Sequence, residues 1–204
     1  MAEDYGIYIN IHQFIKYRYD VEISPLSREE FTKSYLSNKY IDIKTKNVVV
    51  ILTMDGGEYS GTGAAIKKIL VKYMKQSPSL KELILVSRFN FIVVNNGVIA
   101  DLVAAKKLVS DLTSGDDRQI WVQVRPKSIF YTVIPSITWL SPHRRIDQSI
   151  ITGTGSKWID IKTLPRIEEF DPYVTWIGAR AGEVIEIDRY TPSVGKQSIY
   201  RLVK

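Results

Sequence analysis

The chain has 204 residues, of which 45% are hydrophobic and 25% are charged, a composition typical of a globular protein. It contains no cysteine, which excludes disulfides and thiolate zinc sites, and no apolar run is long enough to span a membrane. The net charge of +6 permits nucleic-acid contact but is spread along the chain rather than gathered in a basic run. These features predict an intracellular protein without membrane attachment.

The first predicted element is an amphipathic helix, because the apolar residues between positions 7 and 15 recur at i, i+4, i+7 and i+8. The sequence Ser27-Arg28-Glu29-Glu30 is a capping-box pattern, which predicts that a second helix begins there and runs to about Leu36. Residues 48–54 form a continuous, largely β-branched run, which is typical of a strand buried on both faces.

Further elements are predicted up to position 133. In chain order they are a helix at 64–74, strands at 83–86 and 91–94, a less regular helix at 98–112, an alternating strand at 119–125 with Ile120, Val122 and Val124 on one face, and a strand at 129–133. Because strands alternate with helices, we expect residues 1–135 to form an α/β domain, a sheet flanked by helices. The connection at 135–142 is the predicted domain boundary.

Residues 136–204 predict a smaller α+β domain with a mixed sheet. Asp171-Pro172 should cap a short helix that Gly178 ends, and Ala181-Gly182 should form a turn. Strands are expected at 183–189 and 198–203, joined by a loop at 191–196, while 150–162 predicts strand or loop. The predicted core of this domain consists of Ile185, Ile187, Ile199 and Leu202.

Catalytic motifs are incomplete in this sequence. Gly61-Thr62-Gly63 and Gly153-Thr154-Gly155 both lack the third glycine of a dinucleotide fingerprint, and the only two histidines, His12 and His143, are far apart. We therefore expect no catalytic residue, no cofactor and no metal site. One alternative stays open: a metal-dependent nuclease could use an Asp-x-Lys triplet.

Two triplets fit that nuclease pattern, Asp42-Ile43-Lys44 and Asp160-Ile161-Lys162. Such short patterns of common residues also arise by chance. The preferred interpretation is that both triplets are the alternating residues of edge strands.

A series of short motifs occurs in order between positions 164 and 204. They are Leu164-Pro165-Arg166-Ile167, Asp171-Pro172, Gly178, Gly182-Glu183-Val184, Ile187-x-Arg189, Gly195 and Tyr200-Arg201. Each is weak alone, but the ordered series resembles the assembly domain of the RNA polymerase subunit five family, whose archaeal members consist of this short domain alone. Pro142-His143 stands where that family has Pro-x-His. Residues 1–135 resemble, more loosely, the jaw domain of the eukaryotic members.

The resemblance implies a non-catalytic subunit of a multisubunit DNA-directed RNA polymerase. Residues 136–204 would dock on the largest subunit and join the other subunits, while residues 1–135 would lie beside the downstream duplex DNA. Contact with that DNA would be weak, made through phosphates and without sequence specificity. A third interpretation is a free-standing DNA-binding protein.

The same resemblance also implies which individual residues make contacts. The assembly contacts it implies are His143, Pro165, Arg166, Asp171, Pro172, Gly182, Glu183, Arg189, Tyr200 and Arg201. The DNA contacts expected are Arg88, Asn90, Lys106 and Lys107, although ordinary solvated charges explain each of these four equally well.

Two departures from the family pattern suggest a polymerase that has diverged from the cellular ones. Glu186 and Asp188 replace a lysine and an apolar residue, and residues 150–162 replace a charged helix. A large DNA virus with its own transcription machinery is the source we expect. The protein would then reside in the host cytoplasm and the virion, whereas a cellular version would be nuclear.

Overall fold

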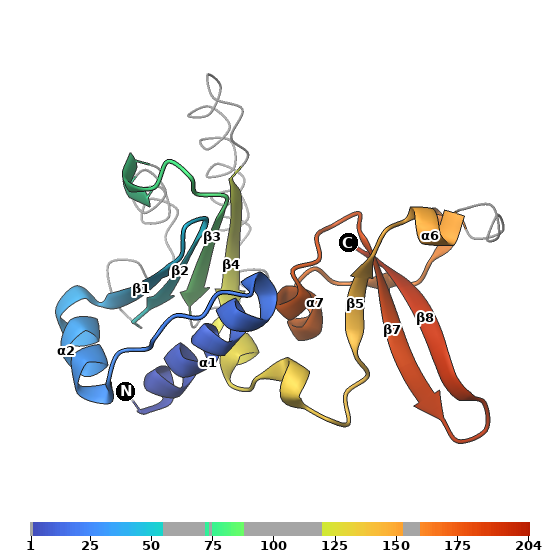
Figure 1. Ribbon diagram of the computed structural model, residues 1–204, viewed down its shortest axis with the longest axis horizontal. Coiled ribbons are helices and arrows are strands. Elements are labelled where there is room, and N and C mark those ends of the chain that lie inside the picture. The colour runs from blue at the N-terminus through green and yellow to red at the C-terminus, as the bar shows by residue number, and fades with distance from the viewer. Residues whose placement is uncertain (1, 55–71, 74, 88–119, 153–159) are drawn as a thin grey trace, which may run out of the picture. The chain divides into compact units, whose positions relative to one another are not determined.

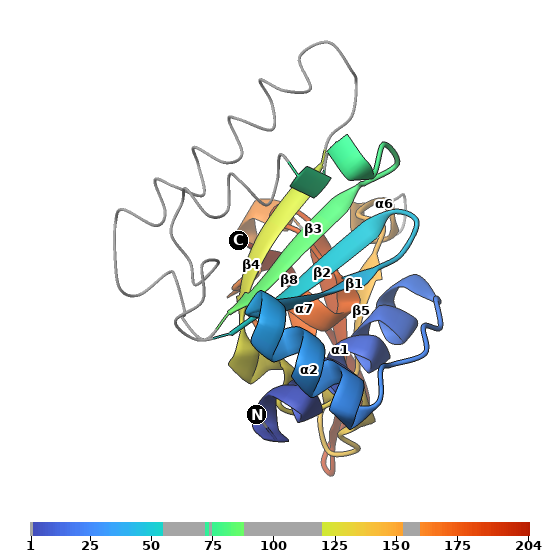
Figure 2. The same cartoon turned by 90° about the vertical axis from the view of Figure 1, so that its left-hand side faces the viewer.

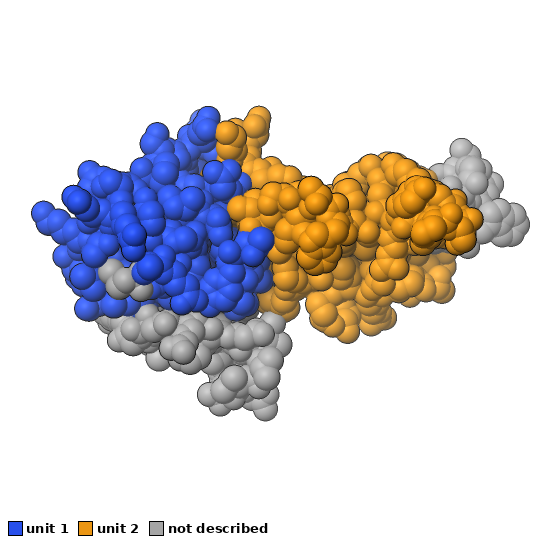
Figure 3. All heavy atoms as spheres, turned by 90° about the horizontal axis from the view of Figure 1, so that it is seen from below, with its two compact units in different colours: residues 1–13, 21–132 blue, residues 14–20, 133–204 orange. Residues whose placement is uncertain are grey.

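The computed structural model describes residues 2–54, 72–73, 75–87, 120–152 and 160–204. The chain folds into two compact units (Figure 3). The N-terminal unit comprises Met1–Gln13 and Val21–Thr132, and the C-terminal unit comprises Phe14–Asp20 and Val133–Lys204. Among the described helices, none combines the length and apolar character that a transmembrane span requires.

The N-terminal unit is built on a four-stranded mixed sheet in the order β1-β2-β3-β4 (Figure 2). The strands are β1 (Tyr40–Lys44), β2 (Val48–Thr53), β3 (Glu82–Ser87) and β4 (Trp121–Pro126). Strand β1 is antiparallel to β2, and β2, β3 and β4 are parallel to one another. Every residue of β2 and β3 is buried, which confirms that the run at 48–54 is a strand covered on both faces.

Two helices precede the sheet, as predicted: α1 (Ala2–Tyr19) and α2 (Arg28–Asn38). The apolar stripe of α1 is buried at Ile7 and Ile11 within this unit. The capping box at the start of α2 is formed in full. The Ser27 hydroxyl accepts a hydrogen bond from the Glu30 amide, and a Glu30 carboxylate oxygen accepts one from the Ser27 amide.

The strand predicted at 129–133 is wrong, because this segment begins with a 3-10 helix, η1 (Lys127–Phe130). A distant side chain explains the difference. The Asn10 amide nitrogen, on α1, lies 2.9 Å from the carbonyl oxygen of Phe130 and 3.1 Å from that of Tyr131. These carbonyl groups are therefore satisfied without a neighbouring strand.

The alternation expected along β4 is also incomplete. Val122 is buried as predicted, but so are Gln123 and Arg125, which should have faced solvent. Gln123 donates a hydrogen bond to the Glu82 carboxylate on β3, so the polar face of β4 is covered too. The strand expected at 91–94 and the helix at 98–112 lie outside the described residues. The helix expected at 64–74 lies mostly outside them, although residues 72–73 and 75–76 are helical.

The C-terminal unit contains the mixed sheet that the sequence predicts, in the order β5-β7-β8-β6 (Figure 1). The strands are β5 (His143–Ile146), β6 (Arg166–Ile167), β7 (Val184–Thr191) and β8 (Gly195–Val203). All neighbours are antiparallel except β6 and β8. The helical elements are η2 (Ile134–Ser136), α6 (Ser149–Thr152), η3 (Ile161–Thr163) and α7 (Pro172–Ile177).

The core of the C-terminal unit lies between α7 and one face of this sheet. It consists of Val174, Ala179, Ile185, Ile187 and Val203, with Ile199 partly buried against it. The core position predicted for Leu202 is wrong, because Val203 occupies it. Leu202 is half-buried on the opposite face, since neighbouring residues of a strand point to opposite sides of the sheet.

The stretch expected to be strand or loop at 150–162 instead includes two helical turns. Residues Ser149–Thr152 form α6, and Asp160 caps η3 by accepting a hydrogen bond from the Lys162 amide at 2.9 Å. Asp160-Ile161-Lys162 is therefore not an edge strand. An aspartate that binds the amide two residues ahead competes with extended structure. Residues 153–159 lie outside the described part.

Candidate interaction surfaces of the C-terminal unit

The predicted assembly residues at the start of α7 have a clear local role. One Asp171 carboxylate oxygen accepts hydrogen bonds from the amides of Tyr173, at 2.8 Å, and Val174, at 3.2 Å. Pro172 fills the first helical position, where no amide hydrogen is needed. Gly178 ends the helix with a φ of 70°, a left-handed conformation. These residues set where α7 begins and ends.

His143 lies beside this helix. Its ring stacks on that of Tyr173 with the centroids 4.2 Å apart, and its Nδ1 donates to the Ser141 carbonyl oxygen at 2.7 Å. Burial lowers the pKa of His143, the Ser141 carbonyl and the charge of Asp171 partly oppose this, and the charges of Arg201 and Arg189 add a smaller lowering. Four of the predicted assembly residues therefore interact electrostatically with one another. They are His143, Asp171, Arg189 and Arg201.

Gly182 and Glu183 occupy the turn before β7. The Gly182 amide donates to the Val203 carbonyl oxygen at 2.9 Å, which ties the turn to the end of β8. One Glu183 carboxylate oxygen accepts from the Arg180 amide at 2.8 Å, and the other pairs with the Arg145 guanidinium at 2.7 Å.

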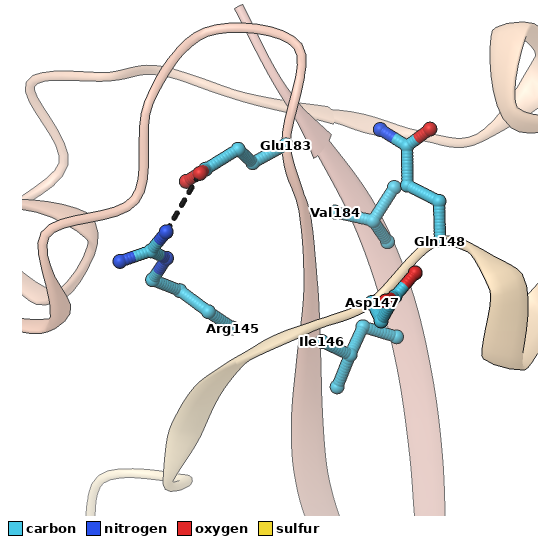
Figure 4. A pocket seen from close by; sticks show the side chains of 6 residues that line it. All are labelled: Arg145, Ile146, Asp147, Gln148, Glu183 and Val184. Atoms are coloured by element: carbon cyan, nitrogen blue, oxygen red, sulfur yellow. Dashed lines mark hydrogen bonds and ion pairs between the residues drawn. The ribbon is translucent and has the colours of Figure 1, made fainter.

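A shallow pocket of about 390 Å³ lies beside this turn (Figure 4). It is lined by Arg145, Ile146, Asp147, Gln148, Glu183 and Val184. Its polar groups already have partners within the chain. The Gln148 amide nitrogen donates to the Gly182 carbonyl oxygen, and the Asp147 carboxylate accepts from the Ser149 amide. The pocket therefore offers little chemistry for a ligand.

The remaining predicted assembly residues do not share one surface. Tyr200 and Arg201 point to opposite faces of β8, because Tyr200 pairs with Glu186 and Arg201 with Ile185. Arg201 reaches across its edge to the Arg166 carbonyl oxygen at 3.2 Å. The Pro165 carbonyl oxygen accepts from the Leu202 amide at 3.0 Å, so Pro165 and Arg166 help to hold β6 on the sheet.

A network of charges on the other face was not predicted. The Arg144 guanidinium on β5 lies 2.6 Å from the Glu186 carboxylate and 3.4 Å from that of Asp188. Asp188 also pairs with Lys196 at 3.2 Å and accepts from the Ser198 hydroxyl at 2.9 Å. The hydrogen bond from Arg144 lowers the pKa of Glu186, and that from Ser198 lowers the pKa of Asp188.

This network accounts for one of the two departures from the family pattern, the acidic residues at positions 186 and 188. Glu186 and Asp188 face Arg144 because β5 pairs with β7 in the register Arg144↔Glu186. No local signal gives this register, since the two strands are about forty residues apart in sequence. The alternating acidic residues Glu186 and Asp188 favour a basic residue on the neighbouring strand, but the sequence does not show which strand that is.

The Asp42 triplet does lie on the edge strand β1, as predicted. The Asp42 carboxylate pairs with Lys44 at 2.8 Å and accepts a hydrogen bond from the Tyr73 hydroxyl. Burial alone would raise the pKa of Asp42, but these two partners together outweigh it and lower the pKa. Within the described residues, no three His, Asp or Glu side chains are grouped to hold a metal ion. The expected DNA contacts Arg88, Asn90, Lys106 and Lys107 lie outside the described residues.

Comparison with known proteins supports the resemblance. Residues 155–203 match the family described as RNA polymerase Rpb5, C-terminal domain. A DNA-directed RNA polymerase RPB5 homolog from African swine fever virus (isolate Tick/South Africa/Pretoriuskop Pr4/1996) is 22% identical over 204 residues, covering 97% of this chain and 95% of the viral one. The DNA-directed RNA polymerase subunit Rpo5 of Thermococcus kodakarensis is 49% identical over 45 residues, which cover 22% of this chain and 55% of the archaeal one.

Together these matches confirm the similarity inferred from the motifs at 164–204. They also show that a relative similar over nearly the whole chain is viral.

Proposed function

We propose that this protein, whose residues 155–203 match the Rpb5 C-terminal domain, is a non-catalytic subunit of a DNA-directed RNA polymerase. That match is the observation that carries the proposal. The full-length similarity to the viral RPB5 homolog supports it, because it extends over the N-terminal unit as well. A virus that transcribes in the cytoplasm would place the protein in the host cytoplasm and the virion.

Within that polymerase, the C-terminal unit would dock on the largest subunit. The support is structural. The family-like residues Asp171, Gly178 and Gly182 cap or turn the chain, and Pro165 holds β6, so the motif series maintains one fold. A fold maintained in this way can present a docking surface without any single indispensable contact residue.

The N-terminal unit would form part of a jaw beside the downstream duplex. Its contacts with DNA would be to phosphates, which position a protein without reading sequence. Arg88, Asn90, Lys106 and Lys107 remain the residues proposed for these contacts. With a net charge of +6 and no basic run, the free chain should bind DNA weakly and with a shallow salt dependence.

The nuclease alternative finds less support in the described residues. Lys44 is paired with Asp42 itself, whereas a catalytic lysine would orient a water molecule. Asp160 caps η3 rather than standing on a strand. We therefore expect no metal-dependent nicking of DNA by the purified chain. Nicking that is lost in Asp42→Ala or Asp160→Ala would instead establish a nuclease.

Co-expression with the polymerase tests the main proposal. The tagged full chain, residues 1–135 and residues 136–204 are each expressed with the largest subunit and recovered through the tag. We expect the full chain and residues 136–204 to recover that subunit and residues 1–135 not to do so. Recovery by residues 1–135 alone would reverse the roles of the two parts. No recovery by the full chain would contradict the proposal itself.

A further inference from the structure

Strand β8 has one long edge beside which no described strand lies. It contains nine residues, but β6 pairs only with its last two, Leu202 and Val203. The outer edge of residues 196–201 therefore has no strand partner among the described residues. Figure 1 shows the β7–β8 hairpin extending beyond β5.

The backbone groups on this edge point outward at alternate residues. The Leu202 amide donates to the Pro165 carbonyl oxygen on the β6 side, whereas the Val203 amide donates to Glu183 on the β7 side. In an antiparallel ladder this alternation continues along the strand. The amides of Lys196, Ser198 and Tyr200 consequently face away from β7, and an unpaired row of this kind is a template for another strand.

The charges flanking this edge differ between the two faces of the sheet. On one face, Lys196 is paired with Asp188, and Arg144 with Glu186, so the charge is balanced. On the other face lie Arg189 and Arg201, and neither forms an ion pair within the described residues. This face of the hairpin therefore carries two arginines that have no ion-pair partner among the described residues.

This asymmetry favours one occupant over another. A second copy of the same edge would bring further arginines and lysines close together, an arrangement that disfavours pairing between copies. An extended segment with acidic residues at every second position would instead place its carboxylates beside Arg201, on the face of the sheet that also carries Arg189 on β7. Its main chain would bond to the outward amides, and its alternate side chains would supply the specificity.

We propose that residues 196–201 of β8 accept, as an added strand, an extended acidic segment of another polymerase subunit. This inference rests on the proposed function, because it takes the partner to be a polymerase subunit. The acidic side chains of the added strand lie beside Arg201 and on the same face of the sheet as Arg189, which is one strand further in on β7. Its other side chains cover Ser198 and Tyr200.

Hydrogen exchange of the full chain in complex with the largest subunit tests the added strand. The amides of Lys196, Ser198 and Tyr200 should become protected, while those of Gln197 and Ile199, already bonded to β7, should change little. Ser198→Pro removes one outward amide and should weaken subunit recovery about tenfold, a lost hydrogen bond accounting for much of this. The matched comparison is Ser198→Ala, which loses the hydroxyl that bonds Asp188 but keeps the outward amide, so recovery should fall clearly less than in Ser198→Pro.

Several outcomes would overturn the added strand. Recovery of the subunit by Ser198→Pro at the level of Ser198→Ala is one. A complex in which the three outward amides gain no protection is another, and it needs no variant to be folded. Both leave the proposed function standing. Failure of the unmodified chain to recover any polymerase subunit would instead contradict the proposed function.

A synthetic peptide of alternating glutamate and valine tests the edge on the free full chain. It should protect the same three amides, whereas a lysine–valine peptide should not. Arg189→Gln should weaken binding of the acidic peptide several-fold, and Arg28→Gln, an equal loss of charge on an exposed residue of α2, should not. Equal protection by both peptides would contradict the assignment of an acidic partner.

Discussion

At Gly182 the backbone φ is +90°, a conformation in which an L-residue is strained. A Cβ added there would meet no atom within 4 Å, so strain is the only cost of a side chain. Gly182→Ala should therefore lower the free energy of unfolding by roughly 1 kcal/mol. Denaturant unfolding monitored by circular dichroism measures this change.

The matched control is the same substitution in the exposed part of α1. Gly6 is helical, and a Cβ there also meets nothing within 4 Å. Because alanine is a better helix former than glycine, Gly6→Ala should stabilise the protein by about 0.5–1 kcal/mol. Two changes of the same sign would show that backbone conformation does not control the effect at Gly182.

Asp4 and Lys127 form a largely buried ion pair in the N-terminal unit, with 2.7 Å between Oδ1 and Nζ. Burial raises the pKa of Asp4, but the hydrogen bonds and charges of Lys127 and of the N-terminal amine together lower it by more, so the folded pKa lies below the unfolded one. The stability that this carboxylate contributes is thus present above the unfolded pKa, near 3.9. It is lost as the pH falls through the folded pKa.

We therefore expect Asp4→Asn to lower the free energy of unfolding by roughly 1–3 kcal/mol at pH 7. The difference from the unmodified protein should shrink as the pH is lowered from about 5 towards 2. Urea unfolding across this pH range measures it. Glu168→Gln, which breaks the exposed pair between Glu168 and Lys204, should cost less than about 1 kcal/mol. A pH-independent difference for Asp4→Asn would contradict the pKa shift.

The roles of individual residues could be predicted from the sequence where a side chain binds backbone amides close to it in the chain. Ser27 and Asp171 both cap helices as predicted, because the amides they bind lie two or three residues ahead. The buried pair of Asp4 and Lys127 could not be predicted in this way. Its members are far apart in sequence, and no local pattern brings them together.

At the scale of elements, α7 depends strongly on its N-cap. The helix has only six residues, and the Asp171 carboxylate satisfies two of its free amides. Asp171→Ala should therefore lower the free energy of unfolding by about 1 kcal/mol, within a range of roughly 0.5–2. Asp171→Asn keeps a capping oxygen and should lose only a few tenths. Thermal unfolding compares the two, and equal losses would indicate that the charge, not the cap, is important.

The elements that were predicted incorrectly share a physical cause. Residues 129–133 have the composition of a strand, but Asn10 binds the carbonyl groups of Phe130 and Tyr131, and the segment begins with the end of a 3-10 helix instead. Gln123 alternates like an exposed residue, yet Glu82 on the neighbouring strand binds it. In both cases a tertiary contact overrides a local preference. The strands β2 and β3 were predicted correctly because their runs are continuously apolar.

On the scale of the whole molecule, residues 14–20 belong to the C-terminal unit although they precede it by more than a hundred residues. Phe14 and Trp176 are fully buried, and their rings meet edge to face with centroids 5.4 Å apart. Arg18 also donates a hydrogen bond to the Thr175 carbonyl oxygen at 3.3 Å. The periodicity of α1 predicted that Phe14 is buried but could not predict its partner.

This packing leads to a prediction about the C-terminal unit. Phe14→Ala removes an aromatic ring from the side of Trp176 and should lower the stability of this unit by about 3–5 kcal/mol. Hydrogen exchange of the β7 and β8 amides measures that stability directly. The control is Tyr17→Ala on the same helix. The Tyr17 ring also lies near that of Trp176, with the centroids 6.1 Å apart, but Tyr17 is 48% exposed. Its replacement should therefore lower the free energy of unfolding by only about 1 kcal/mol.

The same packing predicts how the fragment 136–204 behaves. It keeps the motif series and the core around Ile185, but it lacks Phe14 and leaves one side of Trp176 uncovered. Exchange of its β7 and β8 amides should therefore be faster than in the full chain and similar to that in Phe14→Ala. Binding to the largest subunit should slow it, since a ligand that binds only the folded form stabilises it. Exchange in the free fragment as slow as in the full chain would show that residues 14–20 contribute nothing to this unit.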